Sequence, residues 1–401
     1  MADLRIALLT HSVNPRGGVV HVLELGRALC ALGHRVTVVA PAAKAQQLFR
    51  ASPCEIDLAP LDLGGATSLH DTVRARIAAM RAHLAARIRG GDFDLVHAHD
   101  GIGGNAMLDL RDAGLAVALL RTVHHVDTFG DARVQALEER SIRGADRLLC
   151  VSAVWCDALR ERFGIEAAQV ANGVDLARFS PPAAAQRSPR DAALAQRLGL
   201  RGGPVVLTVG GIEARKNTPA LLDAFIALRA RFSQAQLVVA GGASLLDHRG
   251  AAHRFAATAR AAGLSIGAGG DIIPAGVLHD DEMPALYRCA DVLAMPSTLE
   301  GFGLAALEAR ACGTPAVVSR IAPFTEHFGE HDVHWCDPHD TASIADALRR
   351  AIADRSRERP AVCERYGWAV SAQRHVALYR ALLDTNPRNS DARDALPAAM
   401  A

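Results

Sequence analysis

Short apolar segments alternate with helix-like segments along most of the chain, in two successive series. The first series runs from LRIALLT at 4–10 through the helix-like VVHVLELGRALCALGH to RVTVVAP, and the second starts with PVVLTVG at 204–210. Short buried strands that alternate with helices predict a parallel sheet covered on both faces. The sequence therefore predicts an α/β fold built from two doubly wound, Rossmann-like domains.

The two series suggest where the domains begin and end. We expect the first domain at residues 1–180 and the second at 204–367, joined by a linker at 181–203 whose sequence is rich in Pro, Ala and Arg. The last residues, 385–401, have no periodicity, and we predict that they are disordered. Ligands of doubly wound sheets bind at the carboxyl ends of the strands, so a cleft between the domains is the expected site.

Composition argues against several classes of protein. Lys and Arg number 44 and Asp and Glu 43, and this net charge of +1 gives no reason to expect a nucleic-acid partner. The opening MADLR leads directly into a strand without the cleavage site of a signal peptide, and no apolar run approaches the roughly 20 residues of a membrane span. Eight scattered cysteines without C-x-x-C pairs indicate reduced thiols and a cytoplasmic protein.

One segment has a cationic surface. A helix predicted over 72–89 combines an apolar stripe with Arg74, Arg81 and Arg89 on one flank and with Arg76 and Arg87 on the other. One interpretation is a helix packed on its sheet with a cationic outer face. The alternative is a weak peripheral contact with the anionic headgroups of a membrane.

The segment PSTLEGFGLAALEARACGTPAV, at 296–317, carries two glutamates around a strand-to-helix turn. Exposed N–H groups at a helix N-terminus bind phosphate, so we expect phosphate contacts from the amides of Gly301, Phe302, Gly303 and Leu304. Glu300, on the loop, would then contact sugar hydroxyls or a developing positive charge, and Glu308, inside the helix, a ribose diol. The alternative is that Glu300 is a turn residue and Glu308 lies on a solvated helix face.

Two further loops are candidates for phosphate contacts. In VGGIEARKN, Arg215 and Lys216 precede a helix, and Lys216 is one of only two lysines in a chain that otherwise uses arginine. In NPRGGVVH, Gly17 and Gly18 precede a helix where the backbone can approach a ligand closely, although the loop lacks the G-x-G-x-x-G spacing of a nicotinamide site. The alternatives are a solvated cation pair and a flexible turn.

Histidines follow two strands of the first domain. His124, in RTVHHVDTF, falls at the carboxyl end of its strand and is a candidate site residue, with His125 and Asp127 either orienting it or capping the next segment. In DLVHAHDG, strand alternation places His97 and His99 on one face. No third ligand is identifiable nearby, which argues against a metal site.

Taken together, these motifs resemble the retaining glycosyltransferases of family 4, which have the two-domain GT-B fold. The resemblance covers residues 4–380 and rests on RGGVVHVLELGRALCALGHRVTVVAP, VHAHD, RTVHH, ADRLLCVS, ANGVDLARFSP, VGGIEARKN, LVVAGG and LYRCADVLAMPSTLEGFGLAALEARACGTPAVVS. It implies two domains that face each other across a cleft, with a terminal helix over about 368–384 that crosses back to the first domain.

The resemblance also implies roles for individual residues. Glu300 would act at the transferred sugar with His124 nearby, and Glu308 would bind the ribose. Lys216 would bind the diphosphate, and Gly17 and Gly18 would close on the donor phosphates. The family usually has an arginine directly after the strand glycine, where this chain has Gly211, and Arg215 is the candidate to replace it.

We therefore expect a metal-independent retaining hexosyltransferase without a cofactor, which takes its sugar from a nucleoside diphosphate sugar. The sequence identifies neither the sugar, nor the base, nor the acceptor. The alternatives are an epimerase or a phosphorylase-like enzyme of the same fold, or a non-catalytic protein that binds nucleotide sugars. A phosphorylase would need a cofactor lysine, and Lys44 is the only other lysine of the chain.

Overall fold

The structure is a computed structural model that describes residues 3–182, 188–242, 249–354 and 356–385. The chain divides into two compact units. Unit 1 holds the residues up to Gly173 together with those from Trp368 onward, and unit 2 runs from Val174 to Gly367. The predicted disorder of the C-terminal tail falls almost entirely on residues 386–401, which lie outside the described residues.

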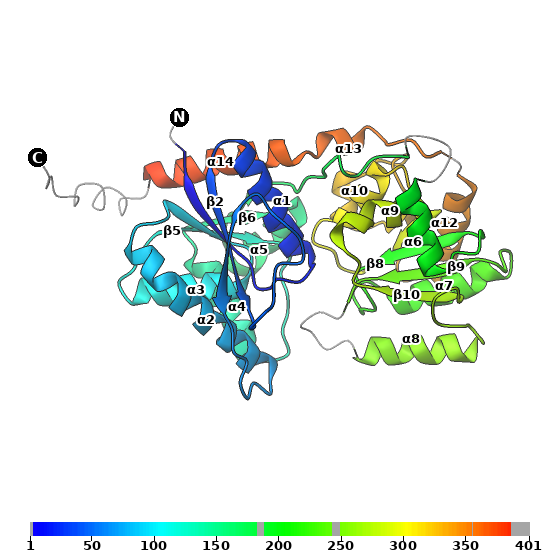
Figure 1. The fold of residues 1–401 in the computed structure, drawn as a ribbon, viewed down its shortest axis with the longest axis horizontal. Helices are drawn as coiled ribbons and strands as arrows, with labels where there is room; N and C mark the ends of the chain where they lie inside the picture. Colours follow the sequence, from blue (N-terminus) through cyan, green and yellow to red (C-terminus); the bar gives the residue numbers. More distant parts are fainter. Residues whose placement is uncertain (1–2, 183–187, 243–248, 355, 386–401) are drawn as a thin grey trace, which may run out of the picture. The chain divides into compact units, whose positions relative to one another are not determined.

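Unit 1 contains a seven-stranded parallel sheet in the order β3-β2-β1-β4-β5-β6-β7 (Figure 1). The strand order reverses between β1 and β4, which makes this point the topological switch of the sheet. The strands are β1 (Arg5–Leu9), β2 (Arg35–Ala42), β3 (Glu55–Pro60), β4 (Leu95–Ala98), β5 (Ala118–Val123), β6 (Arg147–Cys150) and β7 (Ala168–Gln169).

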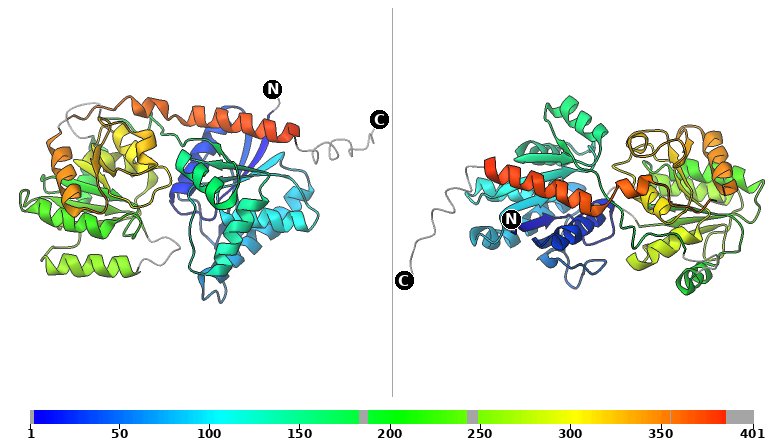
Figure 2. Two further views of the ribbon diagram at one scale, coloured as in Figure 1. Left: turned by 180° about the vertical axis from the view of Figure 1, so that it is seen from behind. Right: turned by 90° about the horizontal axis from the view of Figure 1, so that it is seen from above.

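Helices cover both faces of this sheet. Successive side chains of the central strands point to opposite faces, and both sets of side chains are apolar. Ala7, Leu9, Val96 and Ala98 pack against α2 (Leu69–Arg89) and α3 (Gly101–Asp112). On the other face, α1 (Gly17–Ala31) lies beside the C-terminal α14 (Trp368–Thr385), as Figures 1 and 2 show. The remaining helices of unit 1 are α4 (Ala132–Gly144) and α5 (Ala153–Phe163).

Unit 2 repeats this architecture with a six-stranded parallel sheet in the order β10-β9-β8-β11-β12-β13. Its strands are β8 (Val205–Val209), β9 (Gln236–Ala240), β10 (Ile272–Gly276), β11 (Val292–Met295), β12 (Ala316–Ser319) and β13 (His334–Cys336). Its helices are α6 (Pro189–Leu198), α7 (Thr218–Arg229), α8 (Arg249–Ala261), η1 (Asp280–Glu282), α9 (Met283–Cys289), α10 (Leu304–Ala311), α11 (Phe324–His327), α12 (Thr341–Ala353) and α13 (Val362–Arg365). The predicted α/β class and the parallel sheets are thus confirmed.

The segment expected to be a linker, 181–203, needs a correction. Its residues 183–187 lie outside the described residues, but residues 189–198 form α6, which packs on α9. Asp191 is 1% exposed and accepts two hydrogen bonds from the guanidinium of Arg288, at 2.7 and 3.0 Å. The helix begins with a Ser188 cap and a proline, signals that the composition of the segment had hidden.

Among the described residues, the helices are either too short or too polar to cross a bilayer.

Candidate active site

The loop after β8 meets the loop after β11 in unit 2. Lys216 Nζ donates a hydrogen bond to Glu300 Oε2 at 2.6 Å, and each side chain is only 11% exposed. The backbone joins the same two loops, since Thr298 N donates to Arg215 O at 2.9 Å. The structure thus brings together the predicted site residues Arg215, Lys216 and Glu300, which are distant in sequence but follow the adjacent strands β8 and β11.

Glu300 is held in its charged form by its neighbours. Burial opposes ionisation of this carboxyl and is the largest single influence on its pKa. The charges of Lys216 and Arg215, with hydrogen bonds from Lys216 Nζ and from Gly301 N, outweigh burial and keep the pKa below its usual value. Glu300 is therefore a carboxylate at neutral pH, in contact with a cation.

The residue that departs from the family pattern has a backbone reason to be glycine. Gly211 has a φ of +78°, and a Cβ atom there would lie 3.2 Å from Gly242 O. Opposite it, a Cβ at Gly241 would come within 2.9 Å of Gly211 N. An arginine at position 211 would thus be strained. Arg215 pairs with Glu213 Oε2 at 3.1 Å, and its charge lowers the pKa of Glu300, so it stays the predicted candidate for the missing role.

The N-terminus of α10 is shaped by Gly303. This residue is the N-cap with a φ of +94°, and a Cβ atom would lie 2.6 Å from the ring of Phe324, so only glycine fits. As the N-cap, Gly303 has no side chain with which to cap this end of the helix. Phe302, beside it, packs its ring on His327 at 4.1 Å between centroids and is 4% exposed, so only its backbone can serve the predicted anion site.

Glu308 lies one helical turn further on, in α10. It is half-buried rather than on a solvated face, and its Oε2 accepts a hydrogen bond from Tyr287 Oη at 2.7 Å. Tyr287 is fully buried and belongs to α9. Burial, followed by the charge of Glu308 and this hydrogen bond, raises the pKa of Tyr287 well above its usual value, so Tyr287 stays a hydrogen-bond donor. Glu308 is therefore partly shielded from solvent and held by a buried tyrosine.

In unit 1, the structure brings the predicted residues Gly18 and His124 together. Gly17 and Gly18 are the first residues of α1, and His124 follows β5 directly. A Cβ atom at Gly18 would lie 3.6 Å from His124 Cδ2 and 3.7 Å from its Nε2. The helix start and the histidine thus face each other at the carboxyl end of the sheet.

His124 belongs to a cluster of five histidines between the sheet and the helices α1 and α14, which we call the histidine cluster: His21, His97, His99, His124 and His375. The rings of His97 and His99 are 4.1 Å apart, those of His99 and His124 are stacked at 5.7 Å, and His21 meets His124 edge-on at 4.8 Å. His97 and His99 do lie on one face of the sheet, as strand alternation predicts.

Hydrogen bonds orient rings of this cluster, and burial keeps the histidines neutral. His97 bonds Tyr379 Oη and Thr122 Oγ1, each at 2.8 Å, and His21 Nδ1 bonds Asn172 Oδ1 at 2.7 Å. Burial lowers the pKa of His124 to about 3 and that of His375 to about 4, and it places the pKa of the other three well below the usual value. Across the described residues, no group of three or more His, Cys, Asp or Glu side chains has the arrangement of a metal site.

Several members of the site escaped the analysis of motifs. His21 and His375 lie in the middle of helices, where the sequence shows only a polar residue in an apolar stretch. His21 follows Gly18 by three residues and therefore shares its helix face, which is the one signal that points to it. His375, Tyr379 and Tyr287 gain their roles only through contacts with distant segments.

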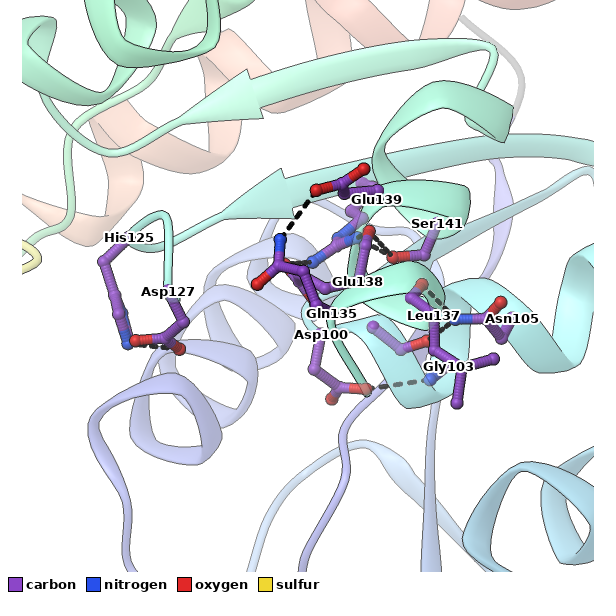
Figure 3. A network of polar contacts seen from close by, with 12 residues as sticks. Asp100, Gly103, Asn105, His125, Asp127, Gln135, Leu137, Glu138, Glu139 and Ser141 are labelled. Carbon is purple, nitrogen blue, oxygen red and sulfur yellow. Dashed lines mark hydrogen bonds and ion pairs between the residues drawn. The ribbon is translucent and has the colours of Figure 1, made fainter. Parts of the chain in front are cut away.

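Polar contacts hold the edge of the sheet beside the cluster (Figure 3). Asp100 follows β4 and caps α3, since its Oδ1 accepts from Gly103 N at 2.8 Å. His125 Nε2 lies 3.0 Å from Asp127 Oδ2, so these two residues contact each other. The buried Arg121 is bound by Glu138 and by Ser141 of α4.

Comparisons with known proteins agree with this picture. The model of Glycosyltransferase Family 4 matches residues 15–178 and that of Glycosyl transferases group 1 matches residues 192–368. A D-inositol 3-phosphate glycosyltransferase of Salinispora arenicola is 33% identical over 284 residues, which are 66% of this chain and 62% of that protein. The match therefore spans less than two thirds of that relative's length.

Two solved structures share the fold. The sucrose-phosphate synthase of Thermosynechococcus elongatus superposes with a TM-score of 0.74 at 24% identity, over 95% of this chain and 99% of that chain. The Anabaena protein HepE, in a complex with UDP-glucose, superposes with a TM-score of 0.70 at 17% identity, over 94% of this chain and all of that one. These likenesses confirm the predicted GT-B type of fold.

Proposed function

Because the chain belongs to the glycosyltransferases that these two family models describe, we propose that it is a retaining hexosyltransferase using a nucleoside diphosphate sugar as donor. The observation that carries this proposal is the buried pair of Lys216 and Glu300 beside the glycine-started helix α10. A cation, a carboxylate and the N-terminus of a helix lie together there, as the diphosphate and the sugar of one donor would require. The complex of HepE with UDP-glucose makes such a donor reasonable for this fold.

The diphosphate would bind in unit 2 at the N-terminus of α10. Lys216 and Arg215 supply positive charge, and the backbone N–H groups of the helix start supply hydrogen bonds. As the bond between sugar and diphosphate breaks, negative charge grows on the leaving phosphate, and these fixed groups stabilise it. This is the task that a divalent cation performs elsewhere, and we propose that the enzyme works without one.

The two glutamates would act on different parts of the donor. Glu300, charged and beside Lys216, would bind sugar hydroxyls and stabilise positive charge at the anomeric carbon. Glu308 would accept hydrogen bonds from the ribose hydroxyls, with its carboxylate positioned by Tyr287. An anion bound at the diphosphate site would also compete with Glu300 for Lys216, so donor binding is expected to loosen the ion pair.

Unit 1 would contribute His124, Gly17 and Gly18. His124 is uncharged at neutral pH, so it can bind a sugar hydroxyl as a neutral hydrogen-bonding group. The glycines leave the start of α1 open for a phosphate, since no atom of the described residues lies within 4 Å of a Cβ atom at Gly17. These assignments rest on the family pattern and stay predictions.

We also propose a cytoplasmic enzyme with a weak membrane contact through α2. Arg76 and Arg87 bind groups of their own unit, namely His11 O and the carboxylates of Glu55, Asp57 and Asp92. The exposed residues Arg74, Arg81 and Arg89 form the flank that would meet lipid headgroups. Flotation with anionic vesicles tests the contact. A protein that stays at the bottom of the gradient would contradict the proposed membrane contact.

The test of the function begins with the donor. Thermal unfolding is measured with UDP, GDP and ADP sugars, because a ligand of the native state alone raises its stability. The best donor is then incubated with acceptors in EDTA, and the anomeric configuration of the product is read by NMR. A donor with an α-linked sugar should give an α-linked product in EDTA. A β-linked product, or release of the nucleotide only after addition of a divalent cation, would contradict the proposal.

A further inference from the structure

Two cysteines that are distant in the sequence contact each other in unit 1. Cys30 Sγ lies 3.6 Å from Cys54 Sγ, although the two residues are 24 positions apart in the chain. Cys30 belongs to the last turn of α1, and Cys54 directly precedes β3, an edge strand of the sheet. The pair therefore connects the C-terminal end of a helix to one edge of the sheet on which this helix packs.

A glycine of α1 makes room for this contact. Gly26 precedes Cys30 by four residues, so the two lie on the same face of the helix, one turn apart. A Cβ atom at Gly26 would lie only 2.7 Å from Cys54 Sγ, so this sulfur packs against bare helix backbone. Helical side chains lean toward the N-terminus, which directs the Cys30 side chain back over the same turn. The helix thus brings both sulfurs to one place.

The two thiols differ in their exposure. All eight cysteines lie in the described part of the chain, and Cys30 is the only one of them that is not buried. Cys54 is 6% exposed, and burial raises the pKa of its thiol to about 12. A small reagent in solution therefore reaches Cys30 first, and Cys54 can react only with a sulfur that already lies next to it.

A second pair of cysteines provides a contrast. A hydrogen bond with Cys156 of α5, together with burial, raises the pKa of Cys150 of β6, so these two thiols also contact each other. Both of them are buried, and a reagent in solution reaches neither in the folded protein. The pair of Cys30 and Cys54 thus combines contact between sulfurs with access from solvent.

We propose that Cys30 and Cys54 are a reversible disulfide site, which closes when a low-molecular-weight disulfide such as glutathione disulfide accumulates. The bonded sulfurs of a disulfide are roughly 2 Å apart, so these two have to approach each other by about 1.5 Å. In a reducing compartment the two thiols stay reduced. The closed bond ties the C-terminal end of α1 to β3.

The reaction is a thiol–disulfide exchange in two steps. First, the Cys30 thiolate attacks one sulfur of glutathione disulfide, breaks its S–S bond and releases a glutathione thiolate. Cys54 Sγ then gives its proton to this thiolate and attacks Cys30 Sγ. The bond from Cys30 to glutathione breaks, and the second glutathione thiolate takes up the proton that Cys30 had lost. The two protein thiols are oxidised to one disulfide, and glutathione disulfide is reduced to two thiols.

The experiment incubates the native chain with glutathione disulfide and maps its peptides by mass spectrometry without reduction. Cys54→Ser leaves Cys30 without its partner, and Cys30→Ser removes the accessible thiol. Cys156→Ser is the matched control, because it breaks the buried pair and keeps both sulfurs of the proposed site. Hydrogen exchange of peptides from β1 and β2 then reports the opening of unit 1 in the oxidised and in the reduced wild type.

We expect a link between Cys30 and Cys54 in the wild type and in Cys156→Ser, and we expect dithiothreitol to reverse it. Cys54→Ser should keep one glutathione on Cys30, and Cys30→Ser should take up none at Cys54. A crosslink between positions 24 residues apart restricts the unfolded chain, so the slowest amides of unit 1 should exchange about a hundredfold more slowly after oxidation.

Three results would overturn the inference. They are a wild type whose Cys30 takes up no glutathione or keeps it without forming the link, a link that forms only in urea, and unchanged hydrogen exchange in the linked protein. The wild type alone decides whether the bond forms, so a variant that fails to fold leaves the test intact.

Discussion

Replacing Lys216 by alanine should destabilise unit 2 as well as remove donor binding. The change leaves the Glu300 carboxylate 11% exposed without the cation that lies 2.6 Å away. Breaking a buried ion pair by removing one partner costs about 3–5 kcal/mol. Since Arg215 still contributes positive charge, we expect a loss near the lower limit, about 3 kcal/mol.

The size of this loss should depend on pH. In the wild type, the pKa of Glu300 lies below its usual value, so the stabilisation is complete above the unfolded pKa and disappears as the pH falls through the folded pKa. In Lys216→Ala, burial outweighs the remaining charge and raises the pKa of Glu300, so protonation relieves the unpaired carboxylate at mildly acidic pH. The difference between the two proteins should therefore be largest at pH 7 and smaller at pH 5.

Hydrogen exchange followed by mass spectrometry measures this difference, because peptides of β8 and β11 report the opening of unit 2 alone. Lys44→Ala is the control, since Lys44 is the only other lysine and is exposed. Adding Glu300→Gln to Lys216→Ala should restore part of the lost stability. An equal loss at both pH values, or no loss at pH 7, would refute the reasoning.

Three further changes test other contacts. Tyr287→Phe should weaken binding of the preferred nucleoside diphosphate about tenfold, because the tyrosine positions Glu308 for the ribose. Binding of the 2′,3′-dideoxy form of this nucleotide should not change. Calorimetry of the wild type and the variant, each with both nucleotides, measures the difference. Gly303→Ala should cost more than about 2 kcal/mol of unit 2 stability because its Cβ meets Phe324, whereas Gly250→Ala, in open space on α8, should cost nothing in urea unfolding. Unit 1 should lose stability as the pH falls from 6.5 to 4.5, since unfolded histidines bind protons that folded ones do not, and His375→Leu should reduce the slope by about 1.4 kcal/mol per pH unit.

The sequence predicted the parts of the site in which chemistry is local. Strand-to-helix turns carry their own signals, so the loop of Glu300, the loop of Lys216 and the start of α1 at Gly18 were all found as motifs. The structure adds that Lys216 and Glu300 contact each other, which no spacing along the chain could specify. The sequence showed that Gly211 departs from the family pattern, which has an arginine at this position. Its positive φ and the close approach of Gly242 explain why this chain has a glycine there.

The parts that the sequence did not predict depend on packing between distant elements. His375 and Tyr379 lie far along the chain from every recognised motif of unit 1, and only the docking of α14 beside α1 brings them to His97 and His21. A polar residue inside a helix reads the same whether it meets solvent or a buried partner. For the same reason the sequence did not predict α6, because the proline at its start and its arginines are also typical of a linker. The structure shows the packing of this helix through the pair of Asp191 and Arg288.

The spacing of eight residues between Glu300 and Glu308 does not describe two positions on one helix, because α10 begins after Glu300. Glu300 precedes the left-handed turn at Gly303, so the two glutamates do not share a helix and their angular separation around an axis decides nothing. Each is placed by a long-range partner instead, Lys216 for the first and Tyr287 for the second. In the proposed function Gly303 would perform two tasks, because the turn that would open α10 toward an anion would also separate the carboxylate for the sugar from the one for the ribose.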